Sequence, residues 1–211
     1  NGITDKEIGV QIVRLPDMPA PNRSIEEVII PGRSPIYIDR GGKGAIPISV
    51  EFNYIGKSDG WNECWRRAKK WLSEKNKELI FSDDSEFFKK VYYVLLGDNA
   101  RESARIGHFT AQFICEDYDY LMSGKSAREK EEVLFNPYSE CRPVYMIEGE
   151  GVCSLMVNGH EFKANVGQNL TINTELMISH RTDGTITNTA VTGQYEDLYL
   201  KEGNNSFDIT L

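Results

Sequence analysis

The chain has 211 residues, enough for one large β domain or two small ones, and its content of 40% hydrophobic and 10% aromatic residues excludes a disordered protein. A formal net charge of −8 argues against a protein whose main task is to bind phosphate groups, and no apolar run approaches the roughly 18 residues that a membrane-spanning helix needs. Four cysteines without Cys-x-x-Cys spacing favour free, buried thiols in a reducing compartment, with two disulfides as the alternative.

The first 45 residues are predicted to form strands joined by exposed connections. Residues 8–14 and 25–30 are predicted strands. Three prolines within residues 15–21 favour an extended connector, because proline lacks the backbone donor that a sheet requires. Residues 33–45 combine glycine with mixed charge, which predicts a long, exposed hairpin or loop. Long loops in compact domains are usually functional or disordered.

The clearest strand pattern spans residues 46–54, where an apolar side chain occupies every second position. Side chains alternate between the two faces of a strand, so this pattern predicts one buried face. Further strands are predicted at residues 79–81, 87–96 and 105–115.

The strongest helical pattern spans residues 60–72 and carries all three tryptophans of the protein. Trp61, Trp65 and Trp71 share one helix face with other apolar residues, and basic residues take the opposite face. Asp59 is the predicted N-cap. Because nearly everything else reads as strand, we interpret the helix as a structural core element packed on a sheet, rather than as a ligand-stacking site.

A shift in charge indicates two domains. Residues 116–135 are highly charged and read as a solvated crossover. From Asn136 onward ten acidic residues stand against four basic ones, whereas the earlier part is nearly balanced. We therefore predict one domain at residues 1–135 and a second at residues 136–211.

The second domain is predicted to be a β-sandwich or jelly roll. Asn158-Gly159 between two alternating runs is the strongest short signal for a hairpin with a type I′ turn. Residues 182–185 and 202–205 are also predicted turns. The predicted fold class is mainly β with one flanking helix, and the strands of this half are expected at residues 143–148, 152–157, 160–164, 170–172, 177–180, 195–201 and 206–211.

No pattern of catalytic, metal-binding or cofactor-binding residues emerges. His108, His160 and His180 are isolated, without a cysteine or histidine at metal-ligand spacing. Gly124-Lys125-Ser126 matches only the end of a phosphate-binding loop, and Asp119 stands where that motif needs its first glycine.

Two pairs of carboxylates are candidates for a glycosidase site. Glu148 and Glu150 are two residues apart, as are Asp117 and Asp119. A glycosidase places its carboxylates about 5–10 Å apart across a cleft, normally on separate strands. These pairs are flanked by glycine or lie in a turn, so we interpret them as solvated edges and predict no enzymatic activity.

A series of segments along nearly the whole chain resembles one family. The segments are residues 46–52 (Ile-Pro-Ile-Ser-Val-Glu-Phe), the helix at 61–72, and residues 79–84, 105–115, 136–138, 157–159, 166–172 and 195–203. Together they resemble the distal tail proteins (Dit) of long-tailed phages and prophages, mostly of Gram-positive hosts.

This resemblance implies a fold, an assembly and partners. The first domain would be a tail-tube-like β-sandwich with a flanking helix that builds a homo-hexameric ring, and the second a galectin-like β-sandwich. The ring would connect the tail tube or terminator protein to the tail-associated lysin, pass DNA without binding it specifically, and hold receptor-binding proteins outside. The protein would be assembled in the cytoplasm of the host bacterium and would lie at the virion tail tip.

Within such a ring we expect the exposed segment at residues 33–45 and the strand edges to make the subunit contacts. The interface candidates are Arg33, Tyr37, Asp39 and Arg40.

Two alternatives come from other functional classes. The first is a carbohydrate-binding β-sandwich protein for host cell-surface attachment. It is disfavoured because no tryptophan follows Trp71, and because roughly 75 residues after Asn136 leave no room for a large inserted module. The second is a glycosidase, for which no catalytic pattern is found.

Overall fold

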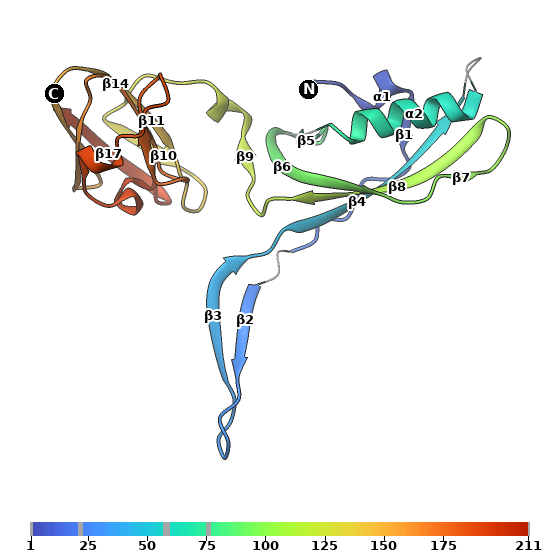
Figure 1. Cartoon of the computed structure of the whole chain (residues 1–211), viewed down its shortest axis with the longest axis horizontal. Coiled ribbons are helices and arrows are strands. Elements are labelled where there is room, and N and C mark those ends of the chain that lie inside the picture. The colour runs from blue at the N-terminus through green and yellow to red at the C-terminus, as the bar shows by residue number, and fades with distance from the viewer. Residues whose placement is uncertain (1, 21–22, 57–59, 75–76, 211) are drawn as a thin grey trace. The chain divides into compact units, whose positions relative to one another are not determined.

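The protein is mainly β and divides into two compact units (Figure 1). The computed structural model describes residues 2–20, 23–56, 60–74 and 77–210. The units are Asn1–Ala127 and Arg128–Leu211. Residues 128–135, which the sequence assigned to the first domain, thus belong to the second unit, because β10 (Val133–Asn136) pairs with β17 (Gly203–Thr210). Within the described part of the chain, no helix has the length and apolar character needed to span a membrane.

The first unit is built on a seven-stranded antiparallel sheet. Its strand order is β1-β4-β8-β6-β5, and β7 and β9 add to β8 and β6. The strands are β1 (Val10–Ile12), β4 (Ile46–Ile55), β5 (Lys77–Phe81), β6 (Asp84–Leu96), β7 (Ala100–Arg101), β8 (Ile106–Cys115) and β9 (Tyr120–Leu121), and a 3-10 helix, η1 (Met122–Lys125), follows β9.

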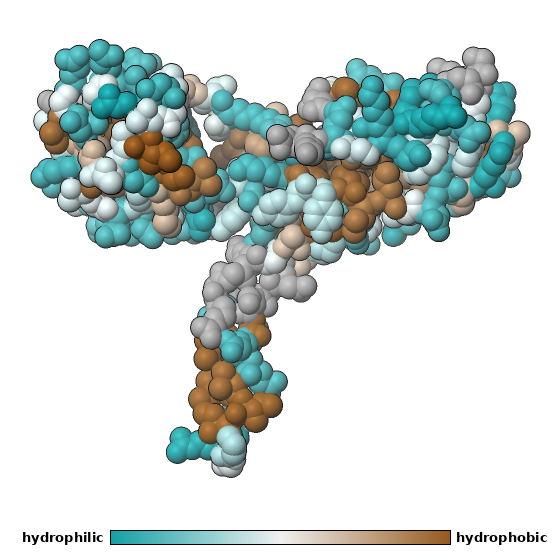
Figure 2. Space-filling model, viewed as in Figure 1, coloured by the Kyte–Doolittle hydropathy of each residue, from teal (hydrophilic) through white to brown (hydrophobic). Residues whose placement is uncertain are grey.

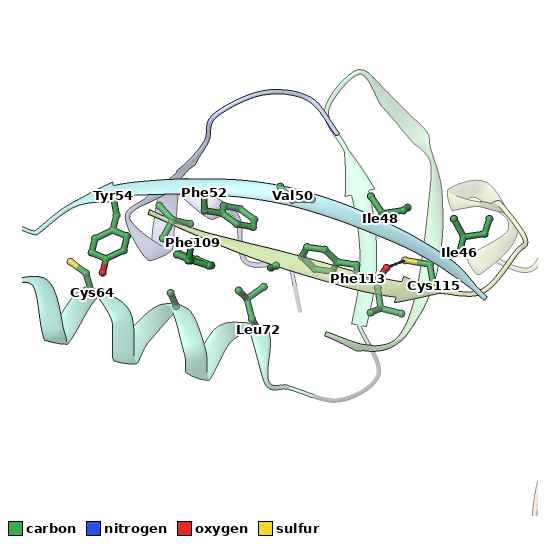
Figure 3. Close-up of a cluster of buried hydrophobic side chains, with 14 residues drawn as sticks. Ile46, Ile48, Val50, Phe52, Tyr54, Cys64, Leu72, Phe109, Phe113 and Cys115 are labelled. Atoms are coloured by element: carbon green, nitrogen blue, oxygen red, sulfur yellow. Dashed lines mark hydrogen bonds between the residues drawn. The ribbon is translucent and has the colours of Figure 1, made fainter. Parts of the chain in front are cut away.

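The centre of this unit is the β4–β8 pair, which runs in register from Ile46 opposite Cys115 to Ile55 opposite Ile106. Every second residue of β4 from Ile46 to Tyr54 is buried, as its sequence pattern predicts. Figure 3 shows Tyr54 of β4 and Phe109 of β8 on the side of the two strands that faces the helix α2 (Gly60–Leu72).

Helix α2 has the predicted bounds and faces the sheet with its apolar side. Cys64, Ala68 and Leu72 form the buried centre of that side. Trp61, Trp65 and Trp71 are half-buried and pack against the edges of the same core, so the structure places all three in a packing position. The predicted N-cap, Asp59, lies outside the described residues.

The N-terminus contains a short helix that the sequence analysis missed. Residues 8–14 were predicted as one strand, but α1 (Asp5–Ile8) precedes the shorter β1. The side chain of Thr4 accepts from the Glu7 backbone, and Glu7 in turn accepts from the Thr4 backbone. This capping box, together with Gly9 in the left-handed conformation, starts and ends the helix within one turn.

Two strands of the first unit form a separate ribbon. β2 (Arg23–Val28) pairs with β3 (Ile36–Lys43) as a two-stranded antiparallel sheet (Figure 1). The connection turns at Gly32, which has a φ of +78°, and the Arg33 amide donates to the Ile30 carbonyl. The exposed segment predicted at residues 33–45 is therefore the second half of a hairpin.

The second unit is a sandwich of a five-stranded and a three-stranded antiparallel sheet. The strand orders are β10-β17-β12-β13-β16 and β11-β14-β15. Inward side chains of both sheets form one core, which includes Ile147, Leu155, Phe162 and Ile172. The remaining elements are β11 (Val144–Gly149), β12 (Val152–Val157), β13 (His160–Asn165), β14 (Gln168–Asn173), β15 (Ile178–His180), β16 (Val191–Thr192), and the 3-10 helices η2 (Asn188–Ala190) and η3 (Tyr195–Leu198).

The predicted hairpin at Asn158-Gly159 is confirmed. Both residues have positive φ, 52° and 84°, and Val157 pairs with His160 across the turn. These angles are those of a type I′ turn, which matches the twist of the flanking strands.

The predicted strand at residues 195–201 is wrong, and so is the turn at 202–205. Residues Tyr195–Leu198 form η3, and β17 begins at Gly203. Buried Asn205 explains the difference: its amide nitrogen donates to the carbonyls of Lys201 and Gly203, and its oxygen accepts from the Lys201 amide. The polar residues that resembled a turn therefore anchor the start of a strand.

Candidate subunit-interaction surface

The histidines do not come together in the structure. His108 lies 3.2 Å from Glu102, and His160 lies 3.6 Å from Asp197. The Nδ1 atom of His180 lies 3.0 Å from the carbonyl oxygen of Arg181. Among the described residues, no three His, Cys, Asp or Glu side chains are placed to hold a metal ion.

The other sequence motifs make structural contacts. Asp119 pairs with Lys89 at 2.6 Å, and the Lys89 side chain is only 13% exposed. Lys125, which would be the phosphate-binding lysine of the partial motif, pairs instead with Glu78. Glu148 lies on β11 opposite Asn169, and Glu150 is exposed just beyond that strand. These ion pairs account for Asp119 and Lys125 without a ligand.

The open face of the first sheet carries a hollow of about 470 Å³. Polar side chains of Glu51, Asn53, Glu102 and His108 contribute to its lining. Glu51, Glu102 and His108 are exposed to solvent, so the hollow is a surface depression and not a closed site.

The β2–β3 hairpin presents apolar side chains to solvent. Five of its large hydrophobic residues are exposed, including Ile29 at 78% and Tyr37 at 64%. Figure 2 shows hydrophobic residues gathered over this hairpin. We call this set the hairpin surface: Ile25, Ile29, Ile36, Tyr37 and Ile38.

The register separates the two faces of the hairpin by chemistry. Ile36 pairs with Val28 and Ile38 with Glu26, so one face carries three aliphatic side chains and one carboxylate. On the other face Tyr37 pairs with Glu27 and donates to its carboxylate at 3.2 Å. A two-stranded hairpin is at best marginally stable alone in water, and exposed patches of this kind mark interaction sites.

The interface candidates from the sequence all lie on this hairpin. Arg33 is in the turn, and Tyr37 and Asp39 are on one face of β3. Arg40 is also on β3, but its side chain lies outside the described residues. Sequence reasoning chose mainly charged residues and missed the exposed isoleucines, although the Ile-Tyr-Ile run at 36–38 was a readable strand signal.

Among solved structures, a phage protein has a similar fold. The crystal structure of the SPP1 Dit (gp 19.1) protein matches 96% of this chain and 92% of its own, with a TM-score of 0.53 and 12% sequence identity. The two proteins share a fold. SPP1 Dit is described as a paradigm of the hub adsorption apparatus in phages that infect Gram-positive bacteria.

The similarity to SPP1 Dit is one of structure and not of sequence. No protein-family model matches the chain, and no curated protein matches it. The coverage of 96% nevertheless includes residues of both compact units.

Proposed function

We propose that this chain is a structural hub protein of a phage tail tip, of the distal tail (Dit) type, and not an enzyme. The observation that carries the proposal is the shared fold with SPP1 Dit over 96% of the chain. The series of sequence segments that resembles the Dit family, spread over both units, supports the same assignment.

In this role six copies form a ring, and the first unit of each builds the ring wall. The β2–β3 hairpin supplies a subunit contact, with Arg33, Tyr37, Asp39 and Arg40 among the contact residues. The hairpin surface supports this contact. A two-stranded ribbon is marginally stable alone, and burying its exposed isoleucines against a neighbouring copy would stabilise both the ribbon and the ring. Head-to-tail contacts of this kind close into a ring when the rotation between copies is fixed.

The ring connects the tail tube or terminator protein to the tail-associated lysin, and the galectin-like second unit is a docking platform that receptor-binding proteins can use. DNA passes through the ring without specific binding. The protein acts at the virion tail tip after assembly in the cytoplasm of the host bacterium.

Substitution of the aliphatic hairpin face tests the ring contact. Ile36→Ser with Ile38→Ser keeps the β2–β3 register and removes two exposed apolar side chains. We expect the ring population to fall at least about tenfold in light scattering, because burying an isoleucine side chain contributes about 1.5–3 kcal/mol.

A control removes two exposed aliphatic side chains elsewhere. Leu176→Ser with Ile186→Ser changes two residues of the second unit that are more exposed than Ile36 and Ile38, and it should leave the ring intact. If the hairpin variant forms rings as well as the control variant does, the hairpin is not a subunit contact.

A further inference from the structure

The outer side of α2 is basic although the chain as a whole is acidic. Arg66, Lys69 and Lys70 are exposed on this side, and Lys69 lies 5.4 Å from the ring centre of Trp65. Glu63 is an acidic neighbour and pairs with Arg66 at 2.9 Å. We call Arg66, Lys69 and Lys70 the basic helix face.

The second unit carries acidic side chains on the outer face of its five-stranded sheet. Met156 of β12 pairs with Asp208 of β17 on one side and with Glu161 of β13 on the other. Adjacent strands are about 4.8 Å apart, so the two carboxylates flank Met156 with roughly 10 Å between their backbones. We call Asp208, Met156 and Glu161 the acidic row.

The surroundings of the acidic row contain further charges of both signs. Lys163, on the same face of β13, pairs with Glu161 at 3.0 Å. At the sheet edge, the Phe207 amide donates to the Glu132 carbonyl, which continues the β10–β17 pairing and brings Glu131 and Glu132 next to Asp208.

The two units differ in net charge: the unit with the acidic row is acidic, and the unit with the basic helix face is nearly neutral. The sequence up to Ala127 has nineteen acidic and eighteen basic residues, whereas the sequence from Arg128 has thirteen acidic and six basic ones. The acidic second unit is therefore the part of the chain whose charge is complementary to the basic helix face.

We propose that the basic helix face of one copy of this chain docks on the acidic row of a second copy. Lysine and arginine side chains of α2 then meet Asp208 and Glu161, and Met156 lies against the partly exposed edge of Trp65, a contact that a thioether makes well with an aromatic ring. The two surfaces are different, so the contact is head-to-tail and leaves a free copy of each surface for the next molecule. This inference rests on charge and position alone and does not depend on the tail-hub proposal.

A charge swap in the full-length chain tests the contact. Sedimentation equilibrium in about 0.05 M salt measures the self-association of each variant. The dissociation constant should be at least about tenfold larger for Lys69→Glu/Lys70→Glu and for Glu161→Lys/Asp208→Lys than for the wild type. The chain with all four substitutions restores opposite charges across the contact and should recover most of the lost affinity. Association of the wild type should also weaken between about 0.05 and about 0.5 M salt, because salt screens exposed charges.

The control for Lys69→Glu/Lys70→Glu is Lys6→Glu/Lys201→Glu, which makes the same change in net charge at two other exposed positions and should associate like the wild type. A wild type that stays monomeric in low salt, or a four-substitution chain no tighter than its weaker parent, would overturn the proposal. The hairpin variants report separately on the tail-hub ring, since they leave both charged surfaces unchanged.

Discussion

The rings of Trp65 and Phe109 lie 4.9 Å apart at an interplanar angle of 57°, and this contact joins α2 to the centre of the first sheet. Phe109 also stacks on Phe52 of the neighbouring strand, with ring centres 5.2 Å apart. The helix is thereby held to both central strands through one aromatic cluster.

Truncation of Trp65 should therefore loosen α2. Because Trp65 is half-buried, we expect Trp65→Ala to lower the free energy of unfolding of the first unit by about 2–4 kcal/mol, slightly less than a fully buried tryptophan. Urea denaturation followed by intrinsic fluorescence measures this. Arg66→Ala, on the exposed side of the same helix, is the control and should change stability by less than about 0.5 kcal/mol.

Gly107 fills a position where no side chain fits. A Cβ at this residue would lie 2.4 Å from Trp61 Nε1 and 2.5 Å from the Tyr54 hydroxyl. Gly107→Ala should cost about 1–3 kcal/mol by overpacking, measured as a lower urea midpoint. At Gly124 the nearest atom to an added Cβ is 3.9 Å away, so Gly124→Ala should be nearly neutral. Equal effects of the two substitutions would mean that space at Gly107 is not limiting.

Asn205 should be essential for the start of β17. Its buried side chain has three hydrogen bonds to the backbone of Lys201 and Gly203, and its oxygen also accepts from Asn158 at 2.8 Å. Asn205→Ala removes these four hydrogen bonds and should cost about 2–4 kcal/mol. Hydrogen exchange should then accelerate at the Lys201 amide, whereas Asn204→Ala, at an exposed neighbour, should leave it protected.

Lys77 makes the stability of the first unit depend on pH. Burial lowers the pKa of Lys77 from its ordinary value of 10.5 to about 8. The unfolded chain thus holds this proton more tightly, and below pH 8 the charged amine opposes folding. Lys77 should therefore contribute a rise in stability as the pH increases from about 8 to 10.5.

The Lys77 contribution is measured by difference, because burial also raises the pKa of Cys115 to about 11, which favours the opposite trend above pH 9. The unfolding free energy of the wild type minus that of Lys77→Met should increase between pH 8 and 10. A difference that stays constant or falls would contradict the lowered pKa.

The sequence predicted the bounds and buried faces of an element best where one side of that element packs into the core of its own unit. The alternation in β4 and the apolar stripe of α2 predicted both elements and their buried faces, because these patterns arise directly from strand and helix geometry. The Asn158-Gly159 turn was equally readable, since its backbone angles restrict the residues that fit.

The same reasoning failed where tertiary contacts override alternation. Leu198, Tyr199 and Leu200 are buried in succession at the end of η3, a pattern that an alternating strand does not allow. The exposed segment predicted at residues 33–45 is part of an exposed hairpin, but the apolar residues of that hairpin were not singled out. Nothing in a single sequence distinguishes an isoleucine that faces its own core from one that faces solvent.

The most direct test of the tail-hub account is the absolute mass of the wild-type protein, measured by light scattering across a range of concentrations. The account predicts a species of six protomers, about 144 kDa for a chain of 24.0 kDa, that is depleted in the Ile36→Ser/Ile38→Ser variant. A mass that remains at 24.0 kDa at every concentration, or an assembly that closes with another number of copies, would contradict the hexameric ring.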